Sequence, residues 1–454
     1  MTTRVSRREK WMYGSGDLGF ALTNTILSVY FALFLTEVVG LQPAVAALAI
    51  FIGSTWDYIN DPLVGYLSDR TRTRWGRRRP FLLFGALPFA LTFALLWWRP
   101  PLESVPALAL YYALAFALFD TAASFAYMPF YALTPEITSD YDERTSLTGT
   151  RMFFSILGSL IAFTLPLAIV GTFHPENLSR VMSMGLVFGM VSAIPLLLAF
   201  AGTRERAEFM TQPRSGFRES IRTSWRNRPF VFGLMLFMFN GVAMSIIQVN
   251  LLYYIKHVLQ RESESDLILG MIFVVAMLAL PLWSWVSGHL NKRWAYIIGI
   301  AFLTVVLLVL ASLSPQTGMP LIVTLCVLAG IGVSAMHVLP WAILPDAIEY
   351  GELQSGKRNE GMFYSLITLA QKVASSVAVP LALLVLQASG YVAGAAVQSE
   401  SAVRGIRIVA GPIPGLALLA GIIFTLLYPL GRENYREINR QLEERRKAAA
   451  EASA

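Results

Sequence analysis

Charged residues are scarce in this sequence. Only 14% of its 454 residues are Asp, Glu, Lys or Arg, and 55% are hydrophobic, whereas about 25% charged residues are usual in a soluble domain. One cysteine, Cys326, lies in an apolar stretch, which excludes a disulfide framework and a cysteine metal site. The sequence also lacks H-E-x-x-H, a glycine-rich phosphate loop and a nucleophile beside a base, so nothing indicates an enzyme. The composition predicts an integral membrane protein.

Hydrophobic runs recur along the whole chain. Each is long enough to cross the hydrocarbon core of a bilayer as a helix, which takes about 20 residues. The sequence therefore predicts an all-α membrane protein with about twelve transmembrane helices. The expected helices are centred near residues 26, 56, 89, 120, 157, 190, 242, 276, 302, 333, 374 and 417.

Basic residues gather in alternate loops between these runs. The N-terminal arm, the loop at 70–79, the segment at 203–228 and the tail after Gly431 hold most of the Lys and Arg residues. Because Lys and Arg accumulate in cytoplasmic loops, we expect a multi-pass protein of the plasma (inner) membrane with both termini in the cytoplasm. The net charge of +7 then reflects topology and does not indicate nucleic-acid binding.

A weak internal repeat divides the chain into halves. The stretch MPFYALTPEITSDYDERTSLTGTRMFFSILGS and the stretch LPWAILPDAIEYGELQSGKRNEGMFYSLITLAQK share the order of proline, acid, basic loop and Met-Phe-aromatic-Ser. Repeated halves with a polar midplane are typical of secondary transporters. We predict two pseudo-symmetric six-helix bundles, a central cytoplasmic loop and a cytoplasmic tail. The bundles are placed at 1–202 and 229–431, the loop at 203–228 and the tail at 432–454.

Two acids form a pair inside the second hydrophobic run. Asp57 and Asp61 are four residues apart, so a helix places both carboxylates on one face. Two acids this close in a low dielectric cannot both ionise cheaply, so one keeps a proton or a cation such as Na⁺ lies between them. Asn60 and Ser124 can add neutral oxygen ligands. The spacing therefore predicts a site for a coupling ion.

Two buried cations keep another interpretation open. Arg151 and Lys372 also lie within apolar runs, where each charge costs roughly 2.5 to 3.5 kcal/mol. They can form ion pairs with Asp57 and Asp61 that only hold the helices together. The pairing can also alternate with cation binding, and the acids would then take part in a transport cycle.

Four segments resemble one known family. WDYINDPLVGYLSDRTRTRWGRRRP, MPFYALTPEIT, DERTSLTGTRMFFSILG and YGELQSGKRNEGMFYSLITLAQK are similar to the glycoside-pentoside-hexuronide:cation symporters, the melibiose permease family of the major facilitator superfamily. The resemblance extends from Tyr13 to about Gly431. It implies the major facilitator fold and cation-coupled sugar transport by alternating access. Na⁺ or H⁺ would be the coupling ion, with no other cofactor, and we expect a monomer.

The resemblance assigns roles to the buried polar residues. Asp57 and Asp61 match the family's cation-binding carboxylates, and Asn60 and Ser124 match neighbouring polar positions. Lys372 matches a lysine that is thought to connect the cation and sugar sites. The resemblance thus implies the same ion site as the spacing of the acids.

The match to galactoside carriers is incomplete. Arg151 matches an arginine that meets the sugar, but Ala21 and Tyr127 stand where those carriers have acids that bind sugar hydroxyls. His337 stands where they have a tryptophan, and Tyr131 replaces another aromatic residue. We therefore expect a substrate other than melibiose.

A sugar site needs aromatic faces and a few fixed polar groups. The aromatic candidates are also explained as packing residues or interfacial anchors, and the histidine as a hydrogen-bonded packing residue. The two basic candidates also suit a carboxylate or phosphate on the substrate. The predicted substrate-binding residues are Tyr127, Tyr131, Trp341, His337, Thr368, Arg151 and Lys372.

The loop after the second run resembles the helix 2 to 3 motif of the superfamily. In GYLSDRTRTRWGRRR, the residues Asp69, Arg70, Arg77 and Arg78 correspond to a charged cytoplasmic latch. Alternatively, these arginines only orient the two helices. We predict that the four residues take part in gating.

The function that we predict is cation-coupled symport of a sugar or glycoside. The nearest alternative is a sodium-dependent symporter of lysolipids or other organic anions with the same fold, because a branch of this family carries lysophospholipids. A passive channel fits less well, because paired acids and repeated halves favour an occluded site.

Overall fold

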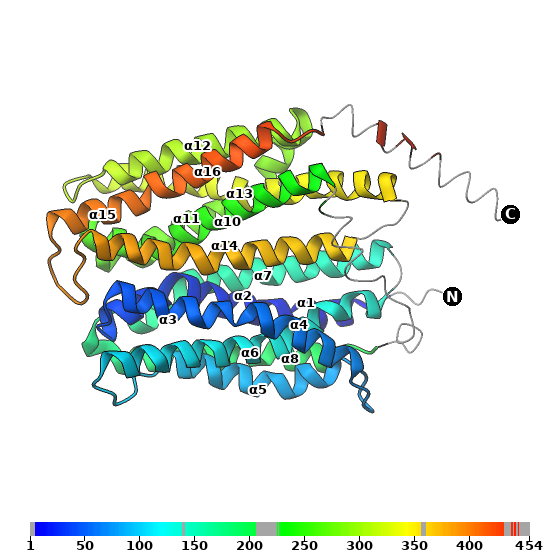
Figure 1. Ribbon diagram of the computed structural model, residues 1–454, viewed down its shortest axis with the longest axis horizontal. Helices are drawn as coiled ribbons and strands as arrows, with labels where there is room; N and C mark the ends of the chain where they lie inside the picture. Colours follow the sequence, from blue (N-terminus) through cyan, green and yellow to red (C-terminus); the bar gives the residue numbers. More distant parts are fainter. Residues whose placement is uncertain are drawn as a thin grey trace. The chain divides into compact units, whose positions relative to one another are not determined.

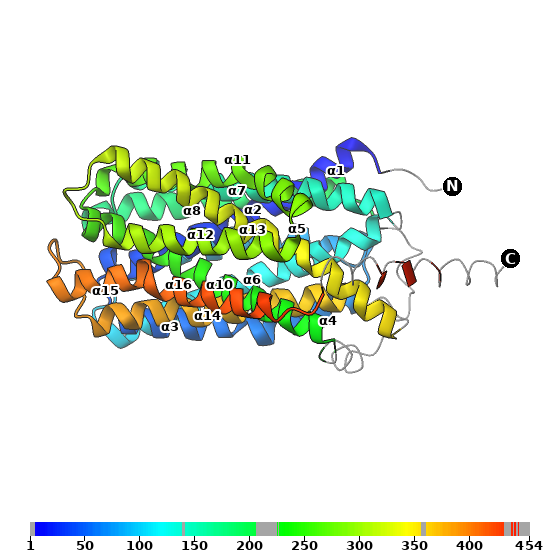
Figure 2. The same cartoon turned by 90° about the horizontal axis from the view of Figure 1, so that it is seen from above.

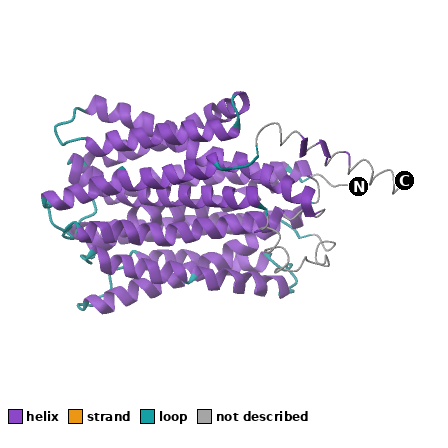
Figure 3. Ribbon diagram, turned by 45° about the horizontal axis from the view of Figure 1, so that its top comes forward, coloured by secondary structure: helices purple, strands orange, loops and turns teal. Residues whose placement is uncertain are grey.

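The computed structural model describes residues 5–138, 141–205, 225, 227–355, 360–430, 437–438, 440–441 and 444 (Figure 3). These residues form helices joined by short loops, and the part described contains no strand beyond one isolated bridge between Thr73 and Gly76. This agrees with the predicted all-α protein. The elements are α1 (Arg7–Gly14), α2 (Gly16–Ile26), η1 (Leu27–Phe31), η2 (Phe34–Val38), α3 (Pro43–Thr55), α4 (Asp57–Arg70), α5 (Arg79–Leu96), α6 (Val105–Ile137), α7 (Tyr141–Val170), η3 (Pro175–Asn177), α8 (Leu178–Gly202), α10 (Arg228–Tyr253), η5 (Tyr254–Leu259), η6 (Glu262–Glu264), α11 (Ser265–His289), α12 (Lys292–Ser312), α13 (Met319–Ser355), α14 (Glu360–Ala388), α15 (Glu400–Ala410) and α16 (Pro412–Leu426).

Ten helical segments in the described part of the chain are long and apolar enough to cross a membrane. Two further helical runs, 16–38 and 43–70, are divided into shorter helices and coincide with the first two predicted spans; the second of them contains Asp57 and Asp61. The described residues thus have a helical run at each of the twelve predicted positions, and ten of these runs are long and apolar enough to span a membrane. The ten segments are Arg79–Leu96, Val105–Thr134, Ser146–Val170, Pro175–Gly202, Arg228–Leu259, Glu262–His289, Lys292–Ser312, Met319–Trp341, Leu366–Ala388 and Glu400–Leu426.

The chain packs into two compact units whose limits do not follow the order of the sequence. The first unit contains Met1–Gln212, Gln248–Gly270 and Val379–Ile406, and the second contains Pro213–Ile247, Met271–Ala378 and Arg407–Ala454. Two segments from the second half of the sequence therefore belong to the unit that the first half forms. The predicted bundle limits at 202 and 229 stay a prediction.

The first unit is held by helix pairs that bury apolar faces. Within it α5 packs beside α6 and α8, and α2 packs beside α7 (Figure 1). Aromatic rings fill the space between these helices: the centroid of Trp97 lies 5.3 Å from that of Phe34, which lies 6.0 Å from that of Tyr112. Buried aromatic pairs at such distances contribute about 0.5 to 1.5 kcal/mol beyond the burial of their area. α4, which contains Asp57 and Asp61, packs beside α6 in the same unit.

The second unit has a core of its own. In this unit α12 packs against α13 and α16 (Figure 2). Its buried side chains are mostly aliphatic, and they include Ile300, Leu303, Leu339, Ile367 and Leu418. Side chains of this kind, spaced at three and four residues along each helix, explain why these segments pack as helices.

Candidate functional site

The two predicted acids lie on α4 and share one hydroxyl partner on α6. Ser124 Oγ lies 2.6 Å from Asp61 Oδ1 and 3.3 Å from Asp57 Oδ1. Asp57 and Ser124 are buried, with exposures of 7% and 4%. A hydroxyl has a single proton, so Ser124 donates to only one carboxylate at a time. Three oxygens, two of them from acids, therefore meet between α4 and α6, and oxygen is the ligand type that hard cations prefer.

Cation binding here would depend on neutral oxygens as well as on acids. Among the described residues, no group of three or more His, Cys, Asp or Glu side chains could hold a metal ion. Asp57 and Asp61 provide two carboxylates, and Ser124 provides a hydroxyl. All three groups are oxygen donors, the type of ligand that hard cations prefer.

Two further contacts fix α4 against α6 and so position the acids. Asn60 Nδ2 donates to the backbone carbonyl of Asp120 at 3.3 Å, and Trp56 Nε1 donates to Thr121 Oγ1 at 2.9 Å. Asn60 is buried, with an exposure of 4%. Its amide nitrogen therefore serves the contact between helices. The predicted role of Asn60 as a cation ligand stays a prediction.

Arg151 of α7 pairs with an acid that the sequence did not indicate as its partner. Arg151 Nε lies 2.9 Å from Asp17 Oδ2, and the two side chains are only 13% and 5% exposed. Asp17 lies in the first turn of α2, 134 residues away. The guanidinium also donates to Thr134 Oγ1 at 3.4 Å. A carboxylate thus offsets the charge of Arg151 within the first unit.

Aromatic rings surround this ion pair. The guanidinium carbon of Arg151 lies 4.6 Å from the ring centroid of Tyr131 and 5.4 Å from that of Phe130. Tyr127 is 1% exposed, and its hydroxyl donates to the Gly16 carbonyl at 3.3 Å. The structure thus places Tyr131 beside the charged pair and Tyr127 in the packing next to it. Their predicted contacts with substrate remain a prediction.

The other four predicted substrate residues lie in the second unit. His337 and Trp341 are four residues apart on α13, and Thr368 and Lys372 are four apart on α14. Each pair therefore lies on one face of its helix. Trp341 is 42% exposed and packs edge-to-face on Phe237, with 4.9 Å between the centroids. Their roles in binding stay a prediction.

The arginine loop between α4 and α5 binds a carboxylate through its backbone. The N–H groups of Arg77, Arg78 and Arg79 donate to the Glu205 carboxylate at 2.6, 2.7 and 2.9 Å. A side chain at Gly76, whose φ is +109°, would collide with this carboxylate. Backbone N–H groups at a helix start attract anions, so Glu205 ties the end of α8 to the start of α5.

The side chain of Arg79 completes this junction. Its Nε and Nη2 donate to the Phe200 carbonyl at 3.2 and 2.8 Å, and its Nη1 donates to the Trp75 carbonyl at 3.2 Å. Sequence analysis named Arg70, Arg77 and Arg78 as gating residues of this loop but missed Arg79 and Glu205. The sequence did contain a signal for Glu205, because it is an acid that lies just after the sixth hydrophobic run. The predicted role of Asp69 falls on a side chain outside the described residues.

Sequence analysis also missed a buried acid at the other end of the first helical run. Glu37 in η2 is 2% exposed and pairs with Lys256 of η5 at 2.5 Å. The signal was available, because Glu37 lies 20 residues after Asp17 and still within the apolar run. A helix of 20 residues spans about 30 Å. The run therefore has one buried acid near each end.

Comparison with known proteins defines the class of protein. The family of MFS/sugar transport proteins matches residues 12–432. A D-xylose–proton symporter of known structure aligns with a TM-score of 0.67 at 15% identity, covering 93% of this chain and 97% of that one. The fold is that of the major facilitator superfamily, as predicted. The chain belongs to the MFS/sugar transport protein family, and it is a multi-pass membrane transporter.

Two relatives resemble this chain along most of their length. The sodium-dependent lysophosphatidylcholine symporter 1-A of Danio rerio is 28% identical over 96% of this chain and 88% of its own. The isoprimeverose transporter of Lactiplantibacillus pentosus is 27% identical over 91% and 87%. The family match and the names of these relatives agree with the prediction of a membrane transporter that works by symport.

Proposed function

We propose that this protein couples the entry of Na⁺ to the transport of a sugar or glycoside by alternating access. The observation that carries the proposal is that Ser124 Oγ contacts both acids, Asp61 Oδ1 at 2.6 Å and Asp57 Oδ1 at 3.3 Å. Two acids and a hydroxyl form a site that a cation stabilises, because its positive charge reduces the repulsion between the carboxylates. The sodium dependence in the name of the zebrafish relative supports Na⁺ over H⁺.

A neutral glycoside is the substrate that we favour. Arg151 already has a countercharge in Asp17, at 2.9 Å. A neutral pair of this kind offers a donor and an acceptor to sugar hydroxyls without requiring charge on the substrate. The ring of Tyr131, 4.6 Å from the guanidinium carbon, provides an aromatic face. The substrate in the name of the Lactiplantibacillus relative agrees with this assignment.

A lysolipid or another organic anion is the second candidate. The observation in its favour is the similarity to the zebrafish lysophosphatidylcholine symporter over 96% of this chain. In that case the anionic group of the substrate would compete with Asp17 for Arg151. The two candidates therefore differ in what happens to this ion pair when the substrate binds.

The cation and the substrate would depend on each other. We infer that binding of the ion offsets one of the two negative charges of Asp57 and Asp61 and adds a further link between α4 and α6, which prepares the substrate site. Coupling of this kind is reciprocal, so each ligand raises the affinity for the other by the same factor. We further propose a monomer in the plasma (inner) membrane with both termini in the cytoplasm, as the distribution of basic residues indicates.

Uptake into proteoliposomes tests this function. A Na⁺ gradient should drive accumulation of a neutral glycoside, and Asp61→Asn should reduce that accumulation at least 100-fold. Ser124→Ala should raise the half-saturating Na⁺ concentration about tenfold, because one ligand is worth roughly 1.4 kcal/mol. Glu400→Gln, which changes an exposed acid, is the matched control. Accumulation driven only by a pH gradient would assign H⁺ instead. Full Na⁺-driven accumulation by Asp61→Asn would refute the coupling site.

A panel of substrates separates the two candidates for the transported molecule. The proteoliposomes are offered neutral disaccharides, uronides and lysophosphatidylcholine under the same Na⁺ gradient. We expect saturable uptake of a neutral glycoside and no competition by the lysolipid. Uptake of the lysolipid that sugars do not inhibit would select the second candidate.

A further inference from the structure

A buried charged cluster joins three segments of the first unit. Glu37 is its centre: its Oε2 lies 2.5 Å from Lys256 Nζ, and its Oε1 accepts hydrogen bonds from the Tyr391 hydroxyl and from the Gly394 N–H. His257 Nε2 lies 3.9 Å from Oε2. The Glu37 side chain is 1% exposed and that of Lys256 is 8% exposed. We call these five residues the Glu37 cluster.

A second layer of contacts seals the cluster. Thr36 Oγ1 and the Tyr253 hydroxyl lie 2.7 Å apart in a buried hydrogen bond. The ring of Tyr253 packs edge-to-face on Tyr391, with 5.5 Å between the centroids. Burial raises the pKa of Tyr391, so its phenol remains protonated and can donate to Glu37. The carboxylate of Glu37 is therefore largely shielded from solvent.

The cluster explains why the first unit includes parts of the second half of the sequence. Glu37 lies in the first helical run, whereas Lys256 and Tyr391 lie in Gln248–Gly270 and Val379–Ile406. These two segments are the ends of helices that otherwise belong to the second unit. The Glu37 cluster thus connects residues from both halves of the sequence at one end of the helices.

The backbone of two participating segments is unusual. Glu37 lies in the π-helical turn η2, and Lys256 and His257 lie in the π-helical turn η5. Such turns are rare and occur frequently at functional sites. Both sides of the main ion pair therefore come from irregular helix.

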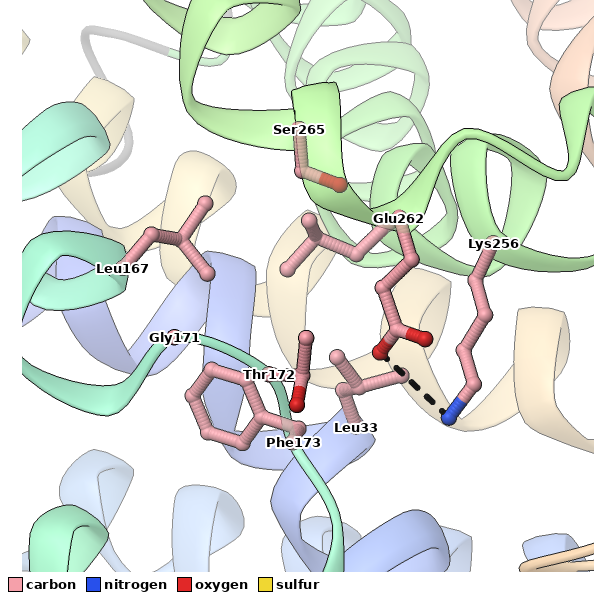
Figure 4. Close-up of a pocket in the computed structure, with 9 residues that line it drawn as sticks. Leu33, Leu167, Gly171, Thr172, Phe173, Lys256, Glu262 and Ser265 are labelled. Atoms are coloured by element: carbon pink, nitrogen blue, oxygen red, sulfur yellow. Dashed lines mark ion pairs between the residues drawn. The ribbon is translucent and has the colours of Figure 1, made fainter. Parts of the chain in front are cut away.

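Lys256 has a second acid within reach. Glu262 Oε1 lies 3.6 Å from Lys256 Nζ, and the Glu262 side chain is 27% exposed. Both residues line a small pocket, together with Leu33 and Thr172 (Figure 4). Leu252 also lines this pocket. The ammonium group thus forms ion pairs with a buried carboxylate and with a partly exposed one at the same time. Separation of Lys256 from Glu37 would leave the cation paired with Glu262.

The charge of the cluster suits a contact that must break and re-form. A buried ion pair gains little over an apolar contact of the same volume, because desolvation offsets the attraction. Removing one partner alone is strongly unfavourable. Such a pair therefore selects the correct partner, yet its small net stabilisation allows the contact to open. An apolar seal would hold these segments together at least as strongly but would offer no alternative partner on opening.

We propose that the Glu37 cluster is a latch that closes one end of the transport pathway, and that Lys256 separates from Glu37 and keeps Glu262 as its partner when this end opens. The inference rests on the alternating access of the proposed function. The test of the latch measures how accessible a reporter cysteine is to a labelling reagent, so neither the substrate nor the coupling ion has to be known. A failure of the latch therefore remains distinct from a failure of the assigned function.

Labelling of a single cysteine tests the latch. Cys326 is the only native cysteine and is 2% exposed, so Cys326→Ser gives a background without reactive thiols. Leu252→Cys then places a reporter in the pocket, one turn before Lys256, at a position that is 4% exposed. The full-length protein in liposomes is treated with a membrane-impermeant maleimide, and the rate of labelling is measured. The rate reports how often this end opens.

The variants have opposite expected effects. Glu37→Gln or Lys256→Met should raise the rate at least tenfold, because each leaves the latch incomplete. Glu262→Gln should lower the rate, because the open state loses its partner for Lys256. The exchange Glu37→Lys with Lys256→Glu should return the rate to within about threefold of the parent.

Controls separate a latch from a purely structural contact. Glu400→Gln breaks an exposed ion pair with Arg404 and should leave the rate unchanged. An unchanged rate in both Glu37→Gln and Lys256→Met, together with lower melting temperatures, would overturn the proposal. If Glu37→Gln does not fold, Tyr391→Phe removes one donor at nearly constant volume and should still raise the rate about threefold. An unchanged rate in Tyr391→Phe and Glu262→Gln would then overturn it.

Discussion

At the scale of single residues, partners determine what each buried charge can do. Asp57 and Asp61 are brought together by a four-residue spacing, and Ser124 then approaches both. Arg151 could not be assigned in the same way, because it pairs with Asp17 across 134 residues. A local spacing predicts neighbours on one helix and says nothing about neighbours on another.

The Asp17–Arg151 pair yields a prediction on stability. Asp17→Asn leaves a largely buried guanidinium without its countercharge, which should lower the free energy of unfolding by about 3 kcal/mol. Removing both charges, in Asp17→Asn with Arg151→Gln, should cost less than the sum of the single losses. Thermal unfolding of the purified protein measures all three. Additive losses would show that the two side chains do not interact.

At the scale of elements, α5 shows how tertiary structure supplies what the local sequence lacks. Its N-cap residue is Arg78, which makes no side-chain capping bond, and Pro80 follows in the first turn. Ser, Thr, Asp or Asn is the usual cap. Here the Glu205 carboxylate accepts from three N–H groups at 2.6 to 2.9 Å. The cap comes from a residue that lies 126 positions further along the chain.

Loss of this cap should weaken the junction of α5 and α8. Glu205→Gln removes the negative charge from three N–H donors and should cost about 1 to 2 kcal/mol of stability. The melting temperature in detergent checks this, with Glu176→Gln as a control at an exposed acid. An equal melting temperature in both variants would contradict the role of Glu205.

At the scale of the whole molecule, function depends on linkage between ligands. The chain belongs to a family of transporters, and the proposed Na⁺ site and substrate site must influence each other if transport is coupled. Saturating Na⁺ should raise the affinity for the glycoside between about 5-fold and 150-fold. Saturating glycoside should raise the affinity for Na⁺ by the same factor. Calorimetric titrations in both orders measure the two factors, and binding of each ligand independent of the other would exclude tight coupling.

The sequence by itself determined that the protein lies in a lipid bilayer and which side chains share a face of one helix. Long apolar runs specify membrane helices because the bilayer has a fixed thickness, and the spacing of Asp57 and Asp61 specifies a shared face. Twelve helices and an acid pair could therefore be predicted. Both depend only on residues near each other in the chain.

Only the tertiary structure decided which distant groups meet. Ser124 reaches the acids, Asp17 pairs with Arg151 and Lys256 pairs with Glu37 across separations of 63 to 219 residues. These contacts depend on how the helices pack and how each helix is rotated about its axis. Hydrophobic periodicity indicates the buried face of a helix but not which residues of another helix it contacts. Buried charges need partners, but the requirement does not name the partner. The packing of the folded chain makes that choice.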